Sequence, residues 1–476
     1  MISYLNNTGS FKIYSPIGLL GLVFLTIVLG VGVAYAPLLL FGVIGLVFTL
    51  FFVIKSLKSP NFTLNILLIF SFFVIGLTRI IPLPLGLFLD VLLVFIFAVI
   101  FIKEFKQIDW SPLKNVLTIS LLVWMLFCIA EISNIEAHST EAWFYSVRDM
   151  ALRPLLLVPL IFLAYHKKSD LTTFINIWFV VSIILSLYSV KQYFLGLFPF
   201  EQHWLNTKGY ETHVIFGEFT RMFSFSSDAN QFGNSVAHAG SVALIFIIGE
   251  KKAIRKLFYL STAIICFFGM FMSGTRGAIV IPIISIGLYL VLSKNYIILT
   301  IGSLIGGTIL YLLVYTFVLQ NVAPIKRMRS AFDPNDASLI VRVENRKMLE
   351  RYLIDKPFGG GIGTAGVWGK RFSPNTFLAE FETDGHYARV YAETGILGLS
   401  LYYAIHFLIL GKMILISWRL KDPRMRTKAI ALTTGVIACF VANYSAPVTV
   451  SLPSNVVVYW SMAFVFIIGN WSKQDL

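Results

Sequence analysis

Long apolar segments, each close to the length of a membrane-crossing helix, recur along the whole 476-residue chain. About 20 apolar residues suffice for a helix to cross the ~30 Å hydrocarbon core of a bilayer. Only 13% of the residues are charged, whereas soluble domains have about a quarter. The chain is therefore predicted to be an all-α polytopic membrane protein. Cys128, Cys266 and Cys439 lie in apolar runs without paired spacing, which argues against a disulfide framework or a zinc site.

We expect about 12–14 transmembrane helices from segments of this length. The first is interpreted as a retained helix rather than a signal peptide. The shortest, Pro154–Tyr165, could also be re-entrant or interfacial. Asp90 lies within a predicted span, either as a functional acid or facing the bundle interior. The segments are Ile17–Ala36, Leu38–Ile54, Leu64–Thr78, Leu85–Ile102, Val116–Ala130, Pro154–Tyr165, Phe174–Phe194, Phe232–Gly249, Leu257–Met272, Ala278–Leu292, Tyr296–Leu319, Ile396–Ile416, Ala429–Asn443 and Val456–Ile468.

Basic residues concentrate in every second short connection, for example in EKKAIRK and WRLKDPRMRTK. If the N-terminus is cytoplasmic, all of these connections fall on the cytoplasmic side, as the positive-inside rule requires. Both termini are then predicted to be cytoplasmic. The net charge of +14 follows from this topology, and nucleic-acid binding is not needed to explain it.

The connections assigned to the outer side carry many arginines against this bias. A guanidinium group binds phosphate through two parallel hydrogen bonds and keeps its charge when partly buried. An outer cavity lined by arginines would suit an anionic lipid-linked substrate such as a polyprenyl diphosphate. A transporter of lipid-linked oligosaccharide would also need such a cavity, but the sequence has no convincing internal repeat, which favours an enzyme. The outer arginines are Arg148, Arg153, Arg221, Arg276, Arg327, Arg329, Arg342, Arg346, Arg351, Arg371 and Arg389.

The long outer segment Gln320–Gly395 contains one predicted amphipathic helix. Its apolar positions with helical spacing are Ile340, Val343, Leu349 and Leu353. Pro357 and the glycines that follow should end it. These glycines lack the Lys-Ser/Thr of a P-loop, so a helix stop with a flexible loop is the simpler interpretation.

Four stretches occur in the order seen in the O-antigen ligase and O-antigen polymerase superfamily of bacterial membrane glycosyltransferases, which the chain resembles. They are RMFSFSSDANQFGNS, MSGTRGAIV, NRKMLERYLIDKPFGGGIGT and DGHYARVYAETGILGL. The resemblance divides the chain into N-terminal transmembrane helices (1–218), an O-antigen ligase-like catalytic region (219–399) with a periplasmic loop (320–395), and C-terminal transmembrane helices (400–476).

The resemblance implies an enzyme of the bacterial inner membrane. It would move a glycan from an undecaprenyl-diphosphate carrier to an acceptor hydroxyl at the periplasmic face, with no metal or other cofactor. The acceptor would be another repeat unit for a polymerase of O-antigen or exopolysaccharide. For a ligase it would be lipid A–core or a protein.

The resemblance also assigns residues to this reaction. Arg221 and Arg276 match the family's two essential arginines and would bind the diphosphate, with Arg346 and Arg389 as further candidates. Both essential positions begin the approach to a membrane helix, where helix dipoles favour phosphate. Alternatively, the arginines anchor their helices at the interface. Asp228 and Asn230 would support the site by ordering the loop or orienting Arg221; these two residues and the four arginines complete the set.

The catalytic base is predicted to be Asp384 or His386. Ligases of the superfamily usually carry a His-Asn pair where this chain has Asp384-Gly385, a variant that looks more like several polymerases. We therefore expect a polymerase, with a ligase as the alternative. Asp384 could instead cap the helix expected to start near His386.

Overall fold

The computed structural model describes residues 37–474, apart from 82, 105–107, 216–218, 317–321 and 333–336, and before residue 37 only Val23, Thr26 and Gly30. The chain divides into two units, Met1–Phe62 and Thr63–Leu476. In the first unit, α2 (Pro37–Lys58) is a 22-residue helix. The expected span Ile17–Ala36 lies outside the described residues except for those three positions.

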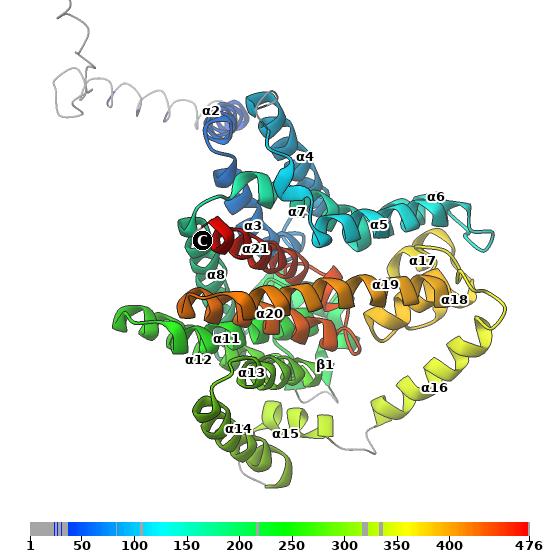
Figure 1. Cartoon of the computed structure of the whole chain (residues 1–476). Coiled ribbons are helices and arrows are strands. Elements are labelled where there is room, and N and C mark those ends of the chain that lie inside the picture. Colours follow the sequence, from blue (N-terminus) through cyan, green and yellow to red (C-terminus); the bar gives the residue numbers. More distant parts are fainter. Residues whose placement is uncertain are drawn as a thin grey trace, which may run out of the picture. The chain divides into compact units, whose positions relative to one another are not determined.

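The remaining helices follow in one continuous series (Figure 1). Those before the first candidate arginine are α3 (Pro60–Leu77), α4 (Leu85–Glu104), η1 (Ser111–Leu113), α5 (Val116–Ala130), η2 (Glu131–Ser133), α6 (Thr140–Val147), η3 (Arg148–Leu152), α7 (Arg153–Ala164), α8 (Lys168–Leu195), α9 (Pro199–Trp204), η4 (Leu205–Gly209) and α10 (Tyr210–His213). Those after it are α11 (Ala229–Gly249), α12 (Ala253–Met272), η5 (Arg276–Ile279), α13 (Val280–Leu292), α14 (Tyr296–Tyr315), α15 (Ala323–Arg329), η6 (Ser330–Phe332), α16 (Ala337–Tyr352), α17 (Gly366–Phe372), α18 (Phe377–Glu380), α19 (His386–Arg419), α20 (Pro423–Ala442), η7 (Val448–Val450) and α21 (Ser454–Gln474). The strands β1 (Val214–Ile215) and β2 (Phe219–Thr220) form one short antiparallel pair, with Val214 opposite Thr220.

Nine helical segments among the described residues are long and apolar enough to cross a membrane. They are built on α3, α4, α5, α8, α11, α12, α19, α20 and α21, and two shorter apolar helices span Arg276–Leu292 and Leu299–Leu312. The predicted all-α polytopic fold is thus confirmed. The short run Pro154–Tyr165 is α7, which continues from α6 through the π-helical turn η3.

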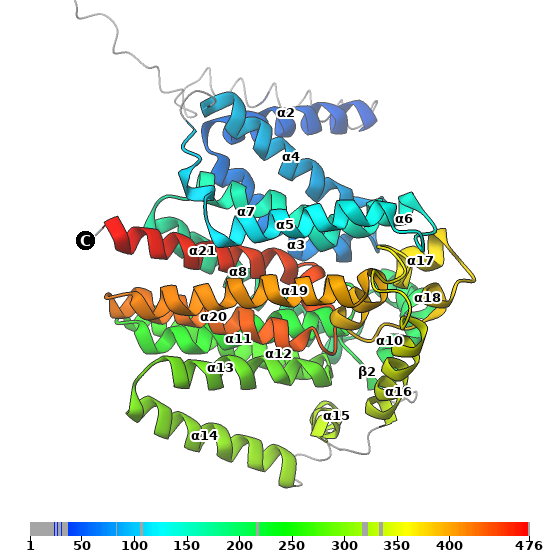
Figure 2. The same cartoon turned by 45° about the vertical axis from the view of Figure 1, so that its right-hand side comes forward.

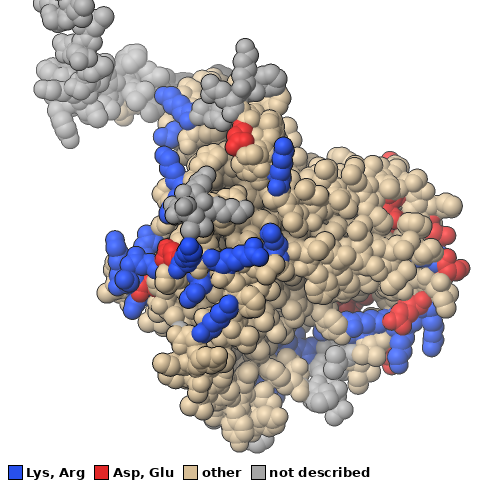
Figure 3. Space-filling model, in the orientation of Figure 1, with Lys and Arg blue, Asp and Glu red and all other residues tan. Residues whose placement is uncertain are grey.

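Helix α11 lies at the centre of the second unit, packed against α8, α12, α13 and α20. Small residues on α11 allow this close approach: a Cβ built at Gly240 would stand 3.0 Å from the Phe267 ring. Helices α19 and α20 run side by side in both views (Figures 1 and 2). In the second unit, Lys and Arg dominate the left-hand end in Figure 3, whereas acidic and basic side chains mix at the right-hand end.

The segment 337–395 forms a small hydrophobic core of its own, made of Leu349, Leu353, Ala365, Leu378, Phe381 and Ala392. The predicted amphipathic helix is confirmed as α16. Only the end of its apolar face is buried, however: Leu349 and Leu353 enter the core, while Ile340 and Val343 remain 49% and 43% exposed. The segment after it returns to α19, where the N–H groups of Gly360 and Gly361 donate to the carbonyls of Ala392 and Glu393.

Candidate functional site

Arg221 follows β2 and is buried, with four of its five N–H donors bonded to the protein. Nε donates to the carbonyl of Ser273 at 3.2 Å, and Nη1 donates to the carbonyl of Thr212 at 3.1 Å. Nη2 donates to Asn230 Oδ1 at 2.7 Å and to Thr275 Oγ1 at 2.9 Å. The pKa of this arginine is lowered to about 10, mainly by burial; the charge of Asp228 opposes this shift and that of Arg276 adds to it. Arg221 thus fixes the turn that leads to Arg276.

That turn places three arginines around one glycine. Gly274 has φ of +56°, a conformation that only glycine adopts freely. A Cβ built there would lie 3.4 Å from Arg327 Cδ and 3.6 Å from Arg221 Cγ, so both side chains pass beside it. Arg327 Nε donates to the carbonyl of Gly274 at 2.9 Å. Arg276, half-buried at the start of η5, reaches Ser330 Oγ at 3.4 Å. We call Arg221, Arg276 and Arg327 the arginine cluster.

The loop between Arg221 and α11 is held by side chains on both sides. Asp228 caps α11 by accepting the N–H groups of Asn230 and Gln231 at 2.8 and 3.0 Å. Ser224 has φ of +49°, and its N–H donates to Gln192 Oε1 at 2.8 Å. The polar residues of this stretch therefore order the backbone that precedes α11.

Arg79 clamps the same loop and was missed by sequence reasoning. Its Nη1 donates to the carbonyl of Ser224 at 2.8 Å, and its Nη2 donates to the carbonyl of Ser226. The guanidinium lies over the rings of Trp204 and Phe223, at 4.1 and 4.5 Å from their centroids. Burial lowers the pKa of Arg79 to about 10. The available signal was an arginine directly after an apolar run, in GLTRIIP.

Asp384 and Arg346 line a second feature, a narrow cleft of about 20 Å³ between α16 and the start of α19. The guanidinium of Arg346 stacks on Tyr444 at 3.9 Å from the ring centroid, and Asn345 Nδ2 approaches Asp384 Oδ2 at 3.5 Å. The helix cap at this point is Gly385, with no side-chain hydrogen bond. The alternative that Asp384 caps α19 is therefore wrong, because the carboxylate faces the cleft instead.

His386 and Asp384 are not brought together. His386 is fully buried, and its Nε2 lies 3.1 Å from the hydroxyl of Tyr402, on the same helix. Its backbone N–H donates to the carbonyl of Asn443. The imidazole thus sits among aromatic rings inside the bundle, whereas Asp384 lines the cleft.

Arg389 is engaged with a buried carboxylate. Its Nε donates to Glu393 Oε1 at 3.1 Å, and its Nη2 donates to Ser146 Oγ of α6 at 2.7 Å. The N–H groups of Gly363 and Ala365 also bond to the Glu393 carboxylate. The glycine loop predicted to be flexible is therefore anchored on α19, by this side chain and by the N–H groups of Gly360 and Gly361, which donate to the carbonyls of Ala392 and Glu393.

The connection 443–447 joins the arginine cluster to the cleft. Tyr444 lines the cleft, and its carbonyl would lie 2.3 Å from a Cβ built at Gly385. Ser445 Oγ would lie 2.6 Å from a Cβ at Gly277, the residue after Arg276. Glycine at both positions lets this connection pack directly against the two parts of the site. Sequence reasoning did not select it, although NYSAP is a polar, proline-containing stretch after an apolar run.

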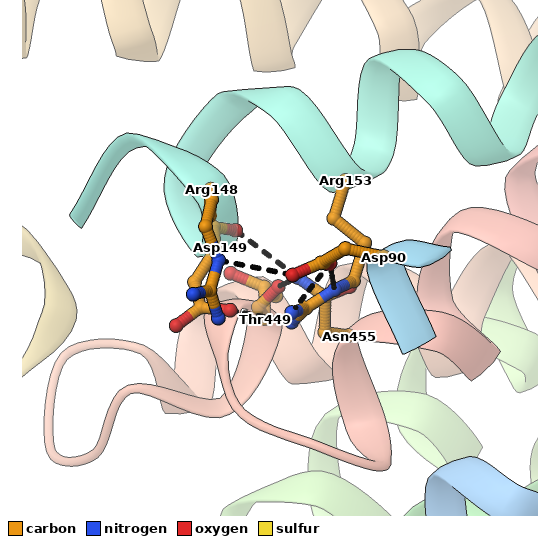
Figure 4. A network of polar contacts seen from close by, with 6 residues as sticks. All are labelled: Asp90, Arg148, Asp149, Arg153, Thr449 and Asn455. Atoms are coloured by element: carbon orange, nitrogen blue, oxygen red, sulfur yellow. Dashed lines mark hydrogen bonds and ion pairs between the residues drawn. The ribbon is translucent and has the colours of Figure 1, made fainter. Parts of the chain in front are cut away.

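Asp90 faces the interior of the helices, where it pairs with two arginines (Figure 4). Arg148 Nε and Arg153 Nη2 each lie 3.0 Å from its carboxylate, and Arg153 also pairs with Asp149. Asn455 Nδ2 donates to the carbonyls of Asp149 and Thr449 at 3.4 and 3.0 Å.

Asn443 in turn exchanges two hydrogen bonds with Thr449, from its Nδ2 to Oγ1 at 2.6 Å and from the Thr449 N–H to its Oδ1 at 3.0 Å. This buried network therefore braces the connection 443–447. Among the residues that the structure describes, no three His, Cys, Asp or Glu side chains converge as metal ligands would.

The fold and the site define a polytopic membrane protein with a group of arginines and a carboxylate-lined cleft joined at the ends of its helices. Residues 261–403 match the family model described as O-antigen ligase. No curated protein matches the chain. The match supports the O-antigen ligase superfamily, and with it glycan transfer in O-antigen or polysaccharide assembly by a membrane glycosyltransferase-like enzyme. The matched range includes Arg276, Arg346 and Asp384, whereas Arg221 precedes it.

Proposed function

We propose that the chain polymerises lipid-linked glycan repeat units at the periplasmic face of the bacterial inner membrane, with undecaprenyl diphosphate as the carrier of the donor. The observation that carries the proposal is the pairing of the arginine cluster with the Asp384 cleft through the connection 443–447. A leaving diphosphate needs cations, an acceptor hydroxyl needs a base, and this chain presents both on neighbouring elements.

The reaction assigns a step to each part. The acceptor hydroxyl oxygen attacks the anomeric carbon of the donor sugar, and its proton passes to Asp384. The bond from the anomeric carbon to the diphosphate oxygen breaks, and Arg276 and Arg327 stabilise the charge that develops on the leaving diphosphate. Arg221 contributes its charge from a buried position and holds the turn in place through its hydrogen bonds to Ser273 and Thr275.

Two further arginines complete the proposal. Arg346 lines the cleft and would bind an anionic part of the substrate there. Arg389 would act as a positioning residue, because its guanidinium is bonded to Glu393 and Ser146. A cleft of about 20 Å³ holds about one water molecule. The proposal therefore requires α16 to move away from Tyr444 when the acceptor sugar enters.

Transfer by purified full-length protein from a defined polyprenyl-diphosphate donor tests the chemistry. Arg276→Ala, Arg276→Lys and Asp384→Asn should each lose about 100- to 1000-fold in rate. Lysine should not rescue, because it lacks the two-pronged donor geometry. Arg371→Ala is the matched control, since this outer arginine stacks on Tyr145 and Phe372. Wild-type transfer by the Arg276 and Asp384 variants would overturn the assignment.

The glycans of a strain lacking the gene separate the polymerase from the other two functions. A lost polymerase leaves single repeat units, either still linked to the carrier or transferred singly as a cap on the acceptor. A lost ligase leaves full-length chains on the carrier. A lost transporter leaves repeat units on the cytoplasmic side, and the purified protein would then show no transfer.

A further inference from the structure

A second cavity, of about 430 Å³, lies where α13 ends, α14 begins and α20 begins. Its polar lining includes Lys294 from the α13–α14 turn and Arg426 from the first turns of α20, together with Tyr289 and Thr427. Its apolar lining includes Ile248, Ile297 and Ile430. The lining thus combines two cations with branched aliphatic side chains, which makes this an amphipathic cavity.

The cavity lies at the opposite ends of the helices from the arginine cluster. Arg276 begins η5, and α13 then runs without interruption to Leu292, two residues before Lys294. At 1.5 Å of rise per residue this path is about 25 Å long, close to the ~30 Å of the hydrocarbon core. Figure 2 shows the α13–α14 turn at the left and α15 and α16 at the right. The cavity therefore opens at the other membrane surface.

The charge around the cavity is strongly positive. Lys251, Lys252 and Lys428 lie on the neighbouring α11–α12 connection and on α20. The two acids nearest in sequence are already bonded to their own backbone: Asp422 accepts the N–H of Arg424 at 3.0 Å, and Glu250 accepts that of Lys251 at 2.9 Å. An anion entering the cavity meets cations that no acid within the cavity lining neutralises.

The rim has the features of a membrane interface. Lys294 Nζ lies 4.6 Å from the centre of the Trp418 ring, whose Nε1 donates to the carbonyl of Leu292 at 3.3 Å. Tryptophan and lysine with an apolar stem are typical of the headgroup level. On α14, Ile297 and Leu304 are 70% and 71% exposed, as lipid-facing side chains are. Ile297 thus belongs both to the lining of the cavity and to the exposed surface of α14.

We propose that this cavity binds the phosphate of an anionic glycerophospholipid, with Lys294 and Arg426 on the phosphate oxygens and Tyr289 and Thr427 as hydrogen-bonding partners. The three isoleucines receive the first part of an acyl chain. A basic cavity between transmembrane helices is a recognised form of lipid-headgroup site. The site is independent of the proposed glycan transfer, because it stands at the other membrane surface.

Native mass spectrometry of the detergent-purified full-length protein tests the proposal, with phosphatidylglycerol and phosphatidylcholine of equal acyl chains as probes. The wild type should retain phosphatidylglycerol in preference. The double variant Lys294→Gln/Arg426→Gln should bind phosphatidylglycerol about 30-fold more weakly, the factor expected for two cations near a lipid phosphate. The control Lys251→Gln/Lys252→Gln removes the same charge at the same end of the molecule, but outside the cavity lining, and should weaken binding by no more than about 3-fold.

Three results would overturn the site. Equal losses in both double variants would mean that diffuse surface charge attracts the lipid. No loss in the cavity variant would place the lipid elsewhere. Displacement of the lipid by millimolar inorganic phosphate would identify a small-anion site. The single variant Lys294→Gln separates lost binding from misfolding. Lys294 is exposed, so this variant should have the unfolding midpoint of the wild type while it binds phosphatidylglycerol more weakly.

Discussion

Gly359 and Gly395 meet backbone to backbone. A Cβ built on Gly395 would stand 2.4 Å from the Gly359 nitrogen and 2.1 Å from the carbonyl oxygen of Pro357. Both glycines have positive φ, +72° and +63°. The N–H of Leu397 also donates to Pro357, at 3.2 Å. The glycine loop after α16 is thereby locked onto a kink in α19, directly beside Glu393.

Replacing Gly395 by alanine should unfold this junction. Gly395 has φ of +63° and ψ of −165°, a conformation open essentially only to glycine, which costs another residue about 1–3 kcal/mol; the overlap with Pro357 adds to it. We expect a lower unfolding midpoint and loss of transfer activity. The control is Gly411→Ala in the same helix, where a built Cβ meets nothing within 4 Å. The unfolding midpoint of this control should stay the same or rise, because alanine stabilises a helix relative to glycine by up to about 1 kcal/mol. Equal midpoints for the two variants would refute the interpretation.

Glu393→Gln should be more harmful than removal of its neighbour Ser146. The substitution leaves Arg389 without its anion and turns an amide toward the N–H groups of Gly363 and Ala365. Breaking a buried ion pair costs about 3–5 kcal/mol, whereas Ser146→Ala removes hydrogen bonds worth about 1–3 kcal/mol. Chemical denaturation of the purified protein measures both. Glu344→Gln, on the exposed side of α16, is the control, and the idea fails if Glu393→Gln behaves like it.

Arg79→Lys should loosen the loop before α11, because one ammonium cannot reach the carbonyls of Ser224 and Ser226 while stacking on two rings. The measurement is the rate at which a cysteine placed at Ser227 reacts with a maleimide. This rate should rise several-fold, because the loss of one hydrogen bond lowers the free energy that holds the loop in place by about 1 kcal/mol. Arg255→Lys is the control. It bonds to Asn176 at 3.2 Å, away from this loop, and unchanged labelling in Arg79→Lys would contradict the clamp.

The protein should lose stability between about pH 6.5 and pH 4 through His213. Burial lowers the pKa of this histidine to about 4, and its Nε2 accepts the N–H of Ala229 at 3.2 Å. The unfolded chain binds the proton at higher pH than the folded chain does. Stability therefore falls as the pH drops through this window, by up to about 3 kcal/mol.

Unfolding midpoints across that pH range test the prediction. His213→Gln should flatten the decline between pH 6.5 and pH 4. His203→Gln should leave it unchanged, because His203 is exposed. A decline as steep in His213→Gln as in the wild type would assign the effect to other groups.

Hydropathy predicted the helices well because a membrane-crossing helix is one continuous apolar run along the sequence. Spans such as α8, α11 and α20 are long and apolar, and the spacing of Leu349 and Leu353 predicted α16. The motifs also placed Arg276 and Asp384 on elements that the connection 443–447 joins. These patterns could not predict which residues far apart in the sequence contact each other.

Arg79 and Ser224 are 145 positions apart, and Ser146 and Arg389 are 243 apart. Neither pair has a local signal, because each depends on which helices become neighbours. The alternative that Asp384 caps α19 was wrong for a local reason. Asp384 and Gly385 are both acceptable N-cap residues, and the local sequence does not show that the Asp384 carboxylate lines the cleft instead.

The hydrogen bond from Arg389 to Ser146 and the stacking of Arg346 on Tyr444 determine which segments such proteins can exchange. A swap restricted to the matched range 261–403 would import both arginines and leave their partners behind on α6 and on the connection 443–447. The shortest transplant that keeps these two arginines with their contacts runs from α6 to that connection. Any recombination point inside this stretch separates at least one of the two arginines from its partner, and should yield hybrids that insert as membrane helices yet fail to assemble the proposed site.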